Sequence, residues 1–390
     1  MTPSPNPSPS MPPDGASAWV EIDLDAISHN VATLRDRVGP AQVMAVVKAD
    51  GYGHGLIPSA RAALAGGATW LAVAQLAEAI EVREAGIDAP LLAWIYPPGA
   101  DLATAIGHDI DLGIGSIAHL RLVTDAARAT GRIARVQLKV DTGLGRGGTL
   151  EDFPEVVEAL GAAIAEGAVT LTGTFSHFAW ADAPEHPTVR AQQERFAHAL
   201  AHLERRGIHP GLRHLANSAA TLTNPSAHFD LVRPGLACYG LSPVPDLAGP
   251  ADFGLRPAMS VRARLTLVKA ARAGQGVSYG HEYTTDRDTI LGVVPIGYAD
   301  GLPRAASSRG PLTVGGARHT VAGRVCMDQV VVDLGPTYAG GAGDVVTLLG
   351  RADRGEPTAQ DWAGAAETIS YEIVTRMGPR LPRVLIGGTS

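Results

Sequence analysis

The sequence has 390 residues, of which 45% are hydrophobic and 18% charged, a balance typical of a globular protein. This length is sufficient for two hydrophobic cores. The net charge of −7 argues against a nucleic-acid-binding surface, and no run of about eighteen apolar residues predicts a membrane span. The two cysteines, Cys238 and Cys326, predict no disulfide framework and a reducing, cytoplasmic location.

Residues 1–16 are rich in Pro and Ser, and this composition predicts a disordered leader. The leader has neither a charged n-region nor an apolar h-region, so we do not expect a secretory signal. A strand follows at 18–24. It could join a sheet formed later in the chain, because chain termini often dock in this way. Asp25 then stands where a helix to about Val38 would begin.

From Val43 to about residue 250, strands and helices alternate, which predicts a parallel sheet. Eight strand–helix units over roughly two hundred residues favour a TIM (β/α)8 barrel, which we assign to residues 17–250. A doubly wound sheet is the alternative, but it needs fewer strands. The predicted strands are 43–47, 70–73, 91–95, 111–114, 135–140, 169–175, 212–216 and 231–233.

After about Pro250, β-rich runs separated by Gly, Pro and Asp replace this alternation. Such runs without long helical periodicity predict a second, mostly antiparallel β domain over residues 251–390.

Lys48 directly follows the first barrel strand, and three glycines and Tyr52 come within the next seven residues. A lysine beside buried valines should have a lowered pKa, and a neutral amine can form an imine with an aldehyde. An isolated lysine would be better explained as snorkelling at a strand end. The combination with the glycines and the tyrosine favours a chemical role.

Other polar side chains also follow predicted barrel strands: Arg146, His177, Asn217 with Ser218, and Arg233. Active-site residues of barrels lie at this rim, so these positions predict a shared site. Ser218 and the backbone N–H groups of Gly235 and Leu236 are placed to bind a phosphate, although Ser218 could equally be a helix N-cap. His177 as a core histidine and Arg233 as a surface arginine remain alternatives.

Gly143–Gly148 matches the pattern G-x-G-x-x-G, but we reject a dinucleotide site there. No helix begins at these glycines, and the next strand has no acidic residue at its end. His198 and His202 lie four residues apart without a glutamate partner, so we expect a solvated helix face and no metal site.

The segment Lys48-Ala49-Asp50-Gly51-Tyr52 resembles the cofactor-binding motif of the alanine racemase family. The resemblance continues in order along nearly the whole chain, through 277–280, 297–301, 323–328 and 368–371. It implies a pyridoxal 5′-phosphate enzyme that interconverts L- and D-alanine and supplies D-alanine for peptidoglycan. It also implies a head-to-tail homodimer in which Tyr279 and Met327 reach the active site of the partner.

By this resemblance, Lys48 would hold the cofactor as an imine and act as the base on the D side, with Tyr279 as the base on the other face. Two bases are needed because one cannot reach both faces of Cα. His177, supported by Arg233, would assist Tyr279. Arg233 can only donate to the pyridine nitrogen, which weakens the electron sink and suits simple proton exchange.

The resemblance assigns the remaining site residues as follows. The cofactor would be bound by Tyr52, Asn217, Ser218, Arg233, Gly235, Leu236 and Tyr371. The substrate carboxylate would be received by Arg146 and the Met327 backbone, and Lys139 would be open to carbamylation. The substrate-access corridor would be formed by Asp182, Tyr298, Arg304, Arg324 and Ile369.

Three rival functions remain open. A racemase of broader specificity, for serine or lysine, would share these motifs. A decarboxylase of the same cofactor fold is disfavoured by the weak electron sink. A non-catalytic pyridoxal-phosphate carrier would not need a second base such as Tyr279.

Overall fold

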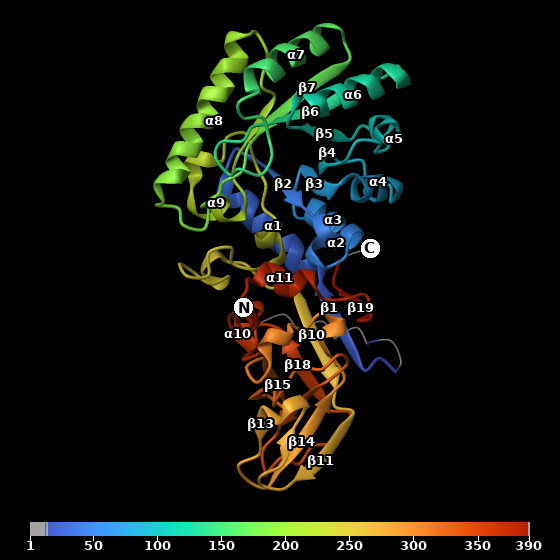
Figure 1. Ribbon diagram of the computed structural model, residues 1–390, viewed down its shortest axis with the longest axis vertical. Coiled ribbons are helices and arrows are strands. Elements are labelled where there is room, and N and C mark those ends of the chain that lie inside the picture. The colour runs from blue at the N-terminus through green and yellow to red at the C-terminus, as the bar shows by residue number, and fades with distance from the viewer. Residues whose placement is uncertain (1–11, 13–14, 389–390) are drawn as a thin grey trace, which may run out of the picture.

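The computed structural model describes residue 12 and residues 15–388, so most of the predicted leader lies outside the described residues. Two domains follow one another along the long axis, a barrel of strands and helices and a β domain (Figure 1). The prediction of a TIM barrel followed by a mostly antiparallel β domain is confirmed. In the described part of the chain, no helix has both the length and the apolarity to cross a membrane.

The barrel sheet has eight parallel strands in the order β8-β7-β6-β5-β4-β3-β2-β9. Hydrogen bonds from Asp230 N–H to Arg213 O (3.1 Å) and from Arg233 N–H to Ala216 O (2.8 Å) link its two end strands and close the ring. The strands are β2 (Gln42–Val46), β3 (Trp70–Gln75), β4 (Leu91–Ile95), β5 (Asp111–Ile114), β6 (Ala134–Lys139), β7 (Val169–Phe175), β8 (Leu212–His214) and β9 (Leu231–Val232).

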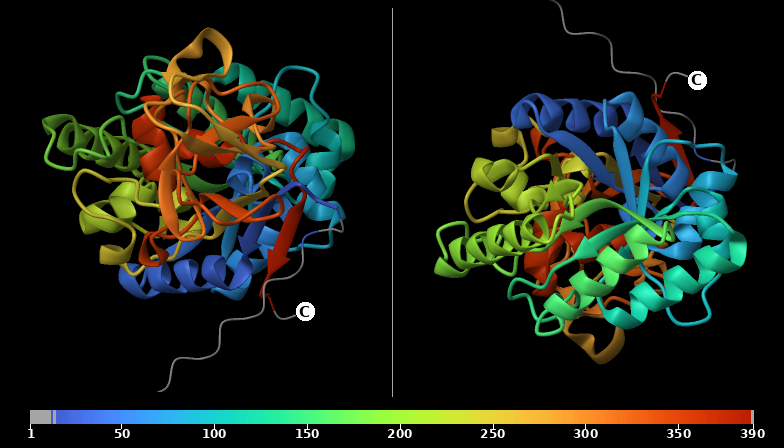
Figure 2. Two further views of the ribbon diagram at one scale, coloured as in Figure 1. Left: turned by 90° about the horizontal axis from the view of Figure 1, so that it is seen from below. Right: turned by 90° about the horizontal axis from the view of Figure 1, so that it is seen from above.

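Helices surround this sheet, as the view along the barrel shows (Figure 2, right). Side-chain caps start several of them: Asp101, Ser116 and Asn217 each accept a backbone N–H three residues ahead. The helices are α3 (Leu56–Ala65), α4 (Leu76–Glu84), α5 (Leu102–Gly107), α6 (Ile117–Thr130), α7 (Phe153–Ala165), α8 (Pro187–Arg205) and α9 (Ser218–Thr223). The predicted strand 212–216 ends at His214, because Ala216 and its neighbours turn toward α9.

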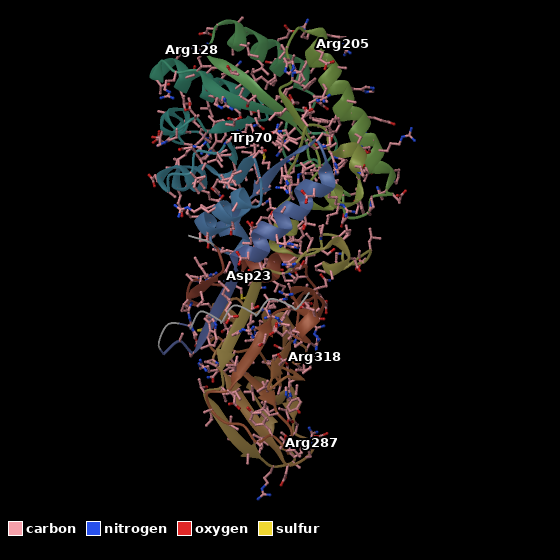
Figure 3. The ribbon with its side chains drawn as sticks, turned by 180° about the vertical axis from the view of Figure 1, so that it is seen from behind. Asp23, Trp70, Arg128, Arg205, Arg287 and Arg318 are labelled. Carbon is pink, nitrogen blue, oxygen red and sulfur yellow. The ribbon has the colours of Figure 1, made fainter. Side chains whose placement is uncertain are left out.

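Helix α1 (Leu24–Val38) packs against α3 and joins the barrel to the β domain. Its N-cap, Asp23, accepts the N–H of Ala26 at 2.9 Å and lies where the two domains meet (Figure 3). The buried Asn30 donates to Cys238 O (3.1 Å) and Arg256 O (2.9 Å) and accepts from Arg256 N–H (2.8 Å). A buried amide with these three partners fixes the segment that leads into the second domain.

The main sheet of the β domain has six strands in the order β16-β15-β18-β10-β1-β19. Its strand β1 (Ala18–Asp23) pairs antiparallel with β10 and parallel with β19. The other strands of this sheet are β10 (Met259–Arg264), β15 (Pro311–Val314), β16 (Ala317–Thr320), β18 (Val345–Leu349) and β19 (Arg383–Ile386). The N-terminal strand is therefore built into the second domain.

Two smaller antiparallel sheets complete the β domain. They consist of β11 (Leu267–Ala271), β14 (Thr289–Val294) and β17 (Val330–Asp333), and of β12 (Gly276–Val277) with β13 (Tyr283–Thr284). Two late helices, α10 (Ala359–Ala366) and α11 (Ser370–Thr375), lie on the side facing the barrel (Figure 1). Helix α11 contacts the segment after β2, so the β domain covers part of the barrel mouth.

Candidate active site

A cavity of about 140 Å³ lies at the carboxyl ends of the barrel strands. It is lined by Val46, Lys48, Tyr52, Trp94, Lys139, Arg146, Phe175, His177, Asn217, Ser218, Arg233, Gly235 and Tyr371. A larger cleft of about 820 Å³ lies between the domains, but none of the residues predicted to react lines it. Because reactive side chains converge on the smaller cavity, we place the candidate active site there.

Lys48 opens a left-handed helical turn, α2 (Lys48–Tyr52), which the sequence did not predict. Ala49, Asp50 and Tyr52 have φ values of 55°, 53° and 54°. Each such residue costs roughly 1–2 kcal/mol relative to the right-handed form. Glu78 stabilises the turn, because one of its carboxylate oxygens accepts the N–H of Ala49 at 2.5 Å. The other oxygen is bound by Ala74 N–H (3.2 Å) and Gln75 N–H (3.0 Å), which ties the turn to β3.

The Lys48 ammonium is in a surrounding that favours its neutral form. Burial lowers its pKa, and the Arg146 guanidinium lowers this pKa further, while Glu78 acts in the opposite direction. The Nζ atom lies 5.9 Å from the ring centroid of Trp94 and 6.0 Å from that of Tyr52. A partly desolvated amine whose neutral form is favoured in this way is a better nucleophile than an exposed lysine.

One side of the cavity is a cluster of uncharged hydrogen-bond donors. The Ser218 hydroxyl accepts the N–H groups of Gly235 (2.8 Å) and Ala237 (3.2 Å). Burial raises the pKa of Tyr52, and burial with the nearby Asp182 carboxylate raises the pKa of Tyr371 to about 12, so both phenols keep their protons. Hydroxyl and N–H donors at a helix N-terminus are the groups that bind a phosphate.

Gly235 is required by the shape of this donor cluster. A Cβ atom at this position would lie only 2.1 Å from the Tyr52 hydroxyl. The side chain of Asn217 turns away from the cluster and caps α9, accepting the N–H of Ala220 at 3.1 Å. Leu236 is buried and does not line the cavity, so its side chain contributes to packing.

Arg233 occupies the other side of the cavity, and both of its terminal nitrogens are hydrogen-bonded. Its guanidinium donates to Ser176 O (2.6 Å) and to His214 Nδ1 (3.0 Å) and lies 3.5 Å from His177 Nδ1. Burial lowers the pKa of Arg233 to about 9, which leaves it a cation at neutral pH. Burial, followed by the charges of Arg233 and Arg146, lowers the pKa of His177 to about 3, so this imidazole is neutral.

The wall of the cavity between these two sides is cationic. Burial, and then the charges of Arg146 and Arg233, lower the pKa of Lys139. Arg146 stands in a loop whose N–H groups converge on the Asp141 carboxylate. Several positive groups around one small cavity favour an anionic ligand or an anionic modification of Lys139.

Other residues predicted for the site lie outside the cavity of the single chain. Tyr279 and Met327, both on the β domain, are 72% and 53% exposed. Of the predicted access corridor, Tyr298, Ile369 and Arg304 are also exposed, and Arg324 is bound to Glu282 at 2.6 Å. Asp182 alone lies near enough to influence a cavity residue, Tyr371. Among the described residues of one chain, Tyr279 therefore does not line the cavity that contains Lys48.

Sequence reasoning missed three cavity or near-cavity residues: Trp94, Phe175 and His214. Phe175 stacks on His214 with ring centroids 5.1 Å apart and lies 5.5 Å from the Arg233 guanidinium. All three stand in the last two residues of a barrel strand. Applying the strand-end rule to aromatic residues as well as to charged ones would have found them.

Comparison with known proteins gives one family for the whole chain. Residues 22–243 match the family model "Alanine racemase, N-terminal domain", and residues 258–385 match "Alanine racemase, C-terminal domain". Alanine racemase of Thermobifida fusca is 58% identical over 371 residues, which cover 95% of this chain and 98% of the relative. That of Frankia casuarinae is 56% identical over 93% and 94% of the two chains.

The solved structures agree with these sequence relatives. The crystal structure of alanine racemase from D-cycloserine-producing Streptomyces lavendulae superposes with a TM-score of 0.95 at 54% identity, covering 97% of this chain and 99% of that one. The alanine racemase of Bacillus anthracis with bound L-Ala-P gives a TM-score of 0.87 at 36% identity, with 96% of each chain covered.

Proposed function

This chain belongs to the alanine racemase family, and we propose that it interconverts L- and D-alanine between Lys48 of one chain and Tyr279 of a second. The family relationship makes the protein an amino-acid racemase, an isomerase. The observation that carries the site assignment is the partly buried Lys48 amine with its lowered pKa, beside a cluster of phosphate-type donors.

The residues present fit pyridoxal 5′-phosphate, the cofactor of this family. A Cβ at Gly235 would lie 2.1 Å from the Tyr52 hydroxyl, so the glycine allows this phenol to reach the donor cluster. We propose that Tyr52, Tyr371, Ser218 and the adjacent backbone N–H groups hold its phosphate and that the Lys48 amine holds its aldehyde carbon. When bound, this cofactor withdraws electrons from the substrate and makes the Cα proton acidic.

Racemisation requires proton transfer on both faces of Cα. We propose that Lys48 Nζ accepts or returns the proton on one face, because its neutral form is favoured by burial. The Tyr279 hydroxyl would act on the other face. A phenol must lose its proton before it can act as a base, so the phenolate form of Tyr279 needs stabilisation at neutral pH. The neutral His177 has its Nδ1 atom 3.5 Å from the Arg233 guanidinium, which leaves its proton on Nε2 as a donor for the Tyr279 oxygen.

The remaining charged groups would position the substrate. Arg146 lines the cavity and would receive the carboxylate of alanine. Lys139 stands close enough for its pKa to be lowered by Arg146, so an anion between them would relieve their repulsion. We propose that carbamylation of Lys139 supplies that anion.

We propose that the second base arrives by head-to-tail dimerisation. Tyr279 and Met327 expose large apolar surfaces, which is costly in a monomer and common at interfaces. In the dimer, Tyr279, the Met327 backbone and the corridor residues of one chain would complete the cavity of the other.

The location we propose is the cytoplasm, where the free thiols of Cys238 and Cys326 would be stable and D-alanine would feed peptidoglycan synthesis.

The shared site is tested by coexpressing two inactive variants, Lys48→Ala and Tyr279→Phe, under different affinity tags. If Lys48 and Tyr279 of different chains form each site, every heterodimer has one intact site and one doubly altered site. Random pairing would then restore about a quarter of the wild-type specific activity. Racemisation is followed by chiral analysis of alanine in deuterated water. If the sites lie within single chains, the mixture remains inactive.

A matched control pairs Lys48→Ala with the double variant Lys48→Ala/Tyr279→Phe, a combination that contains no intact site and should stay inactive. A panel of L-serine, L-lysine and L-alanine separates an alanine racemase from one of broader specificity. Solvent deuterium incorporation into alanine separates a racemase from a cofactor carrier, which would incorporate none.

A further inference from the structure

A continuous chain of buried side chains runs through the barrel interior behind the active site. Arg233 Nη1 lies 3.0 Å from His214 Nδ1, and His214 Nε2 lies 2.8 Å from Gln137 Oε1. Gln137 Nε2 donates to Asp111 Oδ2 at 2.9 Å. The four residues are between 0% and 6% exposed. We call this series the polar chain Arg233–His214–Gln137–Asp111.

The polar chain spans the length of the barrel. Asp111 is the first residue of β5, Gln137 lies within β6, His214 ends β8 and Arg233 follows β9. In a parallel barrel the strands start at one end and finish at the other. Asp111 therefore lies at the end of the barrel opposite to the active site, while Arg233 lines the active-site cavity. The strands concerned form one side of the ring (Figure 2, right).

The hydrogen-bonding capacity of the two ends fixes the direction of every bond between them. A guanidinium can only donate and a carboxylate can only accept. Gln137 must therefore present its NH₂ group to Asp111 and its oxygen to His214. That oxygen requires the proton of His214 on Nε2, which leaves the Nδ1 lone pair free to accept from Arg233. The opposite orientation would bring acceptor against acceptor at Asp111 and donor against donor at Arg233.

Asp111 is itself fixed by two further donors. Arg135 Nε lies 2.6 Å from Oδ1, and Thr172 Oγ1 lies 2.5 Å from Oδ2. Arg135 is the only one of these groups with a substantially exposed side chain, at 39%. With three donors converging on it, the carboxylate acts as an acceptor at every contact. A buried carboxylate with this anchoring can orient a neighbouring amide firmly.

We propose that Asp111 is a positioning residue for the active site. Through Gln137, Asp111 keeps the proton of His214 on Nε2, so that His214 Nδ1 can accept a hydrogen bond from Arg233. The lone pair on His214 Nδ1 is then available whether or not Arg233 is present. The Arg233 guanidinium donates to this acceptor, and the hydrogen bond orients it at the cavity. The functional importance of this arrangement rests on the proposed function, in which Arg233 supports His177, and on the family resemblance, by which Arg233 would donate to the pyridine nitrogen. The tautomer itself does not depend on that function.

Nuclear magnetic resonance of ¹⁵N-histidine-labelled, full-length protein as purified tests the proposal, with the His214→Gln variant to assign the resonance. In Arg233→Met, the arginine can no longer dictate the tautomer, and the proton of His214 should nevertheless remain on Nε2. In Arg233→Met/Asp111→Asn, the Asn amide allows Gln137 to rotate, and the Nδ1–H form of His214 should appear. Nε2–H alone in this double variant, or a mixture already in Arg233→Met, would overturn the proposal.

A second double variant, Arg233→Met/Gln137→Leu, cuts the polar chain but keeps the Asp111–Arg135 ion pair. This variant should also show the Nδ1–H form of His214. It provides the test if Arg233→Met/Asp111→Asn fails to fold. The matched control is Arg233→Met/Arg135→Gln, which weakens the ion pair but keeps the polar chain, and it should retain Nε2–H. If the control behaves like Arg233→Met/Asp111→Asn, Asp111 acts only through its ion pair and the proposal is wrong.

A kinetic comparison adds the functional consequence. With Arg233 present, Gln137→Leu should lower kcat/KM for alanine by between about 2-fold and 30-fold, the usual range for coupling through a buried network. Arg135→Gln should leave it unchanged. An inactive mixture in the shared-site test would disprove the shared active site, whereas the tautomer measurement would still decide the role of Asp111.

Discussion

The carboxylate of Asp141 accepts the backbone N–H of Arg146 at 3.1 Å, and its other oxygen accepts those of Gly143 (2.8 Å), Leu144 (2.9 Å) and Gly145 (3.2 Å). The glycine-rich run that imitates a dinucleotide fingerprint thus does bind an anion, but this anion belongs to the chain itself. The loop is shaped around a side chain, and its shape determines where Arg146 enters the cavity.

Replacing Asp141 with Ala should therefore loosen this loop. Four N–H groups would lose their acceptor, so we expect a loss of unfolding free energy on the order of 2–3 kcal/mol. Because Arg146 would be less well placed for a carboxylate, KM for alanine should rise about tenfold. Asp141→Asn keeps one acceptor oxygen and should give intermediate values. Urea denaturation and steady-state kinetics measure both effects, and an unchanged KM would show that the loop does not position Arg146.

The attachment of the cofactor can be located by borohydride reduction, because the sequence contains only three lysines: Lys48, Lys139 and Lys269. We expect the reduced cofactor on the peptide of Lys48, since burial lowers the pKa of this amine and makes it nucleophilic. Lys48→Ala should abolish both the label and the visible absorbance of lysine-bound cofactor. Label on either other lysine in the wild-type protein would remove Lys48 from its proposed role.

Lys139 should carry an anionic modification. Burial and the charges of Arg146 and Arg233 lower its pKa, and a neutral amine is the form that reacts with carbon dioxide. In protein equilibrated with ¹³C-bicarbonate, a carbamate signal should be visible and should disappear in Lys139→Gln. Lys269→Gln is the matched control, since Lys269 is exposed, and it should keep the signal. A signal that survives in Lys139→Gln would assign the modification elsewhere.

The buried His54 should make stability depend on pH. Burial lowers its pKa to about 4, and its Nδ1 atom lies 2.9 Å from Tyr52 O and 3.0 Å from Gly51 O, so the folded imidazole is neutral with its proton on Nδ1. Below the unfolded pKa of about 6.5, the unfolded chain binds a proton that the folded chain does not, so stability falls as pH decreases toward 4. The loss should be on the order of 3 kcal/mol at pH 4.

The measurement is the free energy of unfolding between pH 4 and pH 7.5 for the wild type and for His54→Gln. The variant should lose only the His54 share of the slope, because the buried His177, whose pKa is lowered to about 3, contributes in the same window. His198→Gln, at an exposed histidine, serves as the control and should keep the wild-type slope. Equal slopes for all three proteins would show that His54 does not cause the dependence.

The strand–helix alternation predicted the barrel, and the strand-end rule placed Lys48, His177, Ser218 and Arg233 on one rim, because both depend on local patterns. The left-handed turn after Lys48 was not predictable in this way. Its positive φ values are stabilised by Glu78, from another strand–helix unit, and a contact of that kind has no periodic signal. The polar chain was missed for the same reason, since Gln137 and Asp111 look like ordinary strand residues.

The position of Tyr279 illustrates a different limit. Its motif was recognised, yet within one chain it lies exposed on the β domain, outside the cavity. The spacing of residues along a sequence does not indicate whether a side chain contributes to the active site of its own chain or to that of a second copy. That relationship comes from surface complementarity, which is a property of the folded molecule.

The placement of β1 has a consequence for biosynthesis. Trp19 pairs with Arg262, and Glu21 pairs with Val384. At 5–20 residues per second, a ribosome needs roughly 20 seconds to more than a minute to reach the last of these partners. Until β10 has been made, β1 has no neighbour on either edge, and the edge that pairs with β19 stays open after the barrel and β10 have been made. The nascent chain therefore carries an open edge that attracts chaperones or other chains until translation ends.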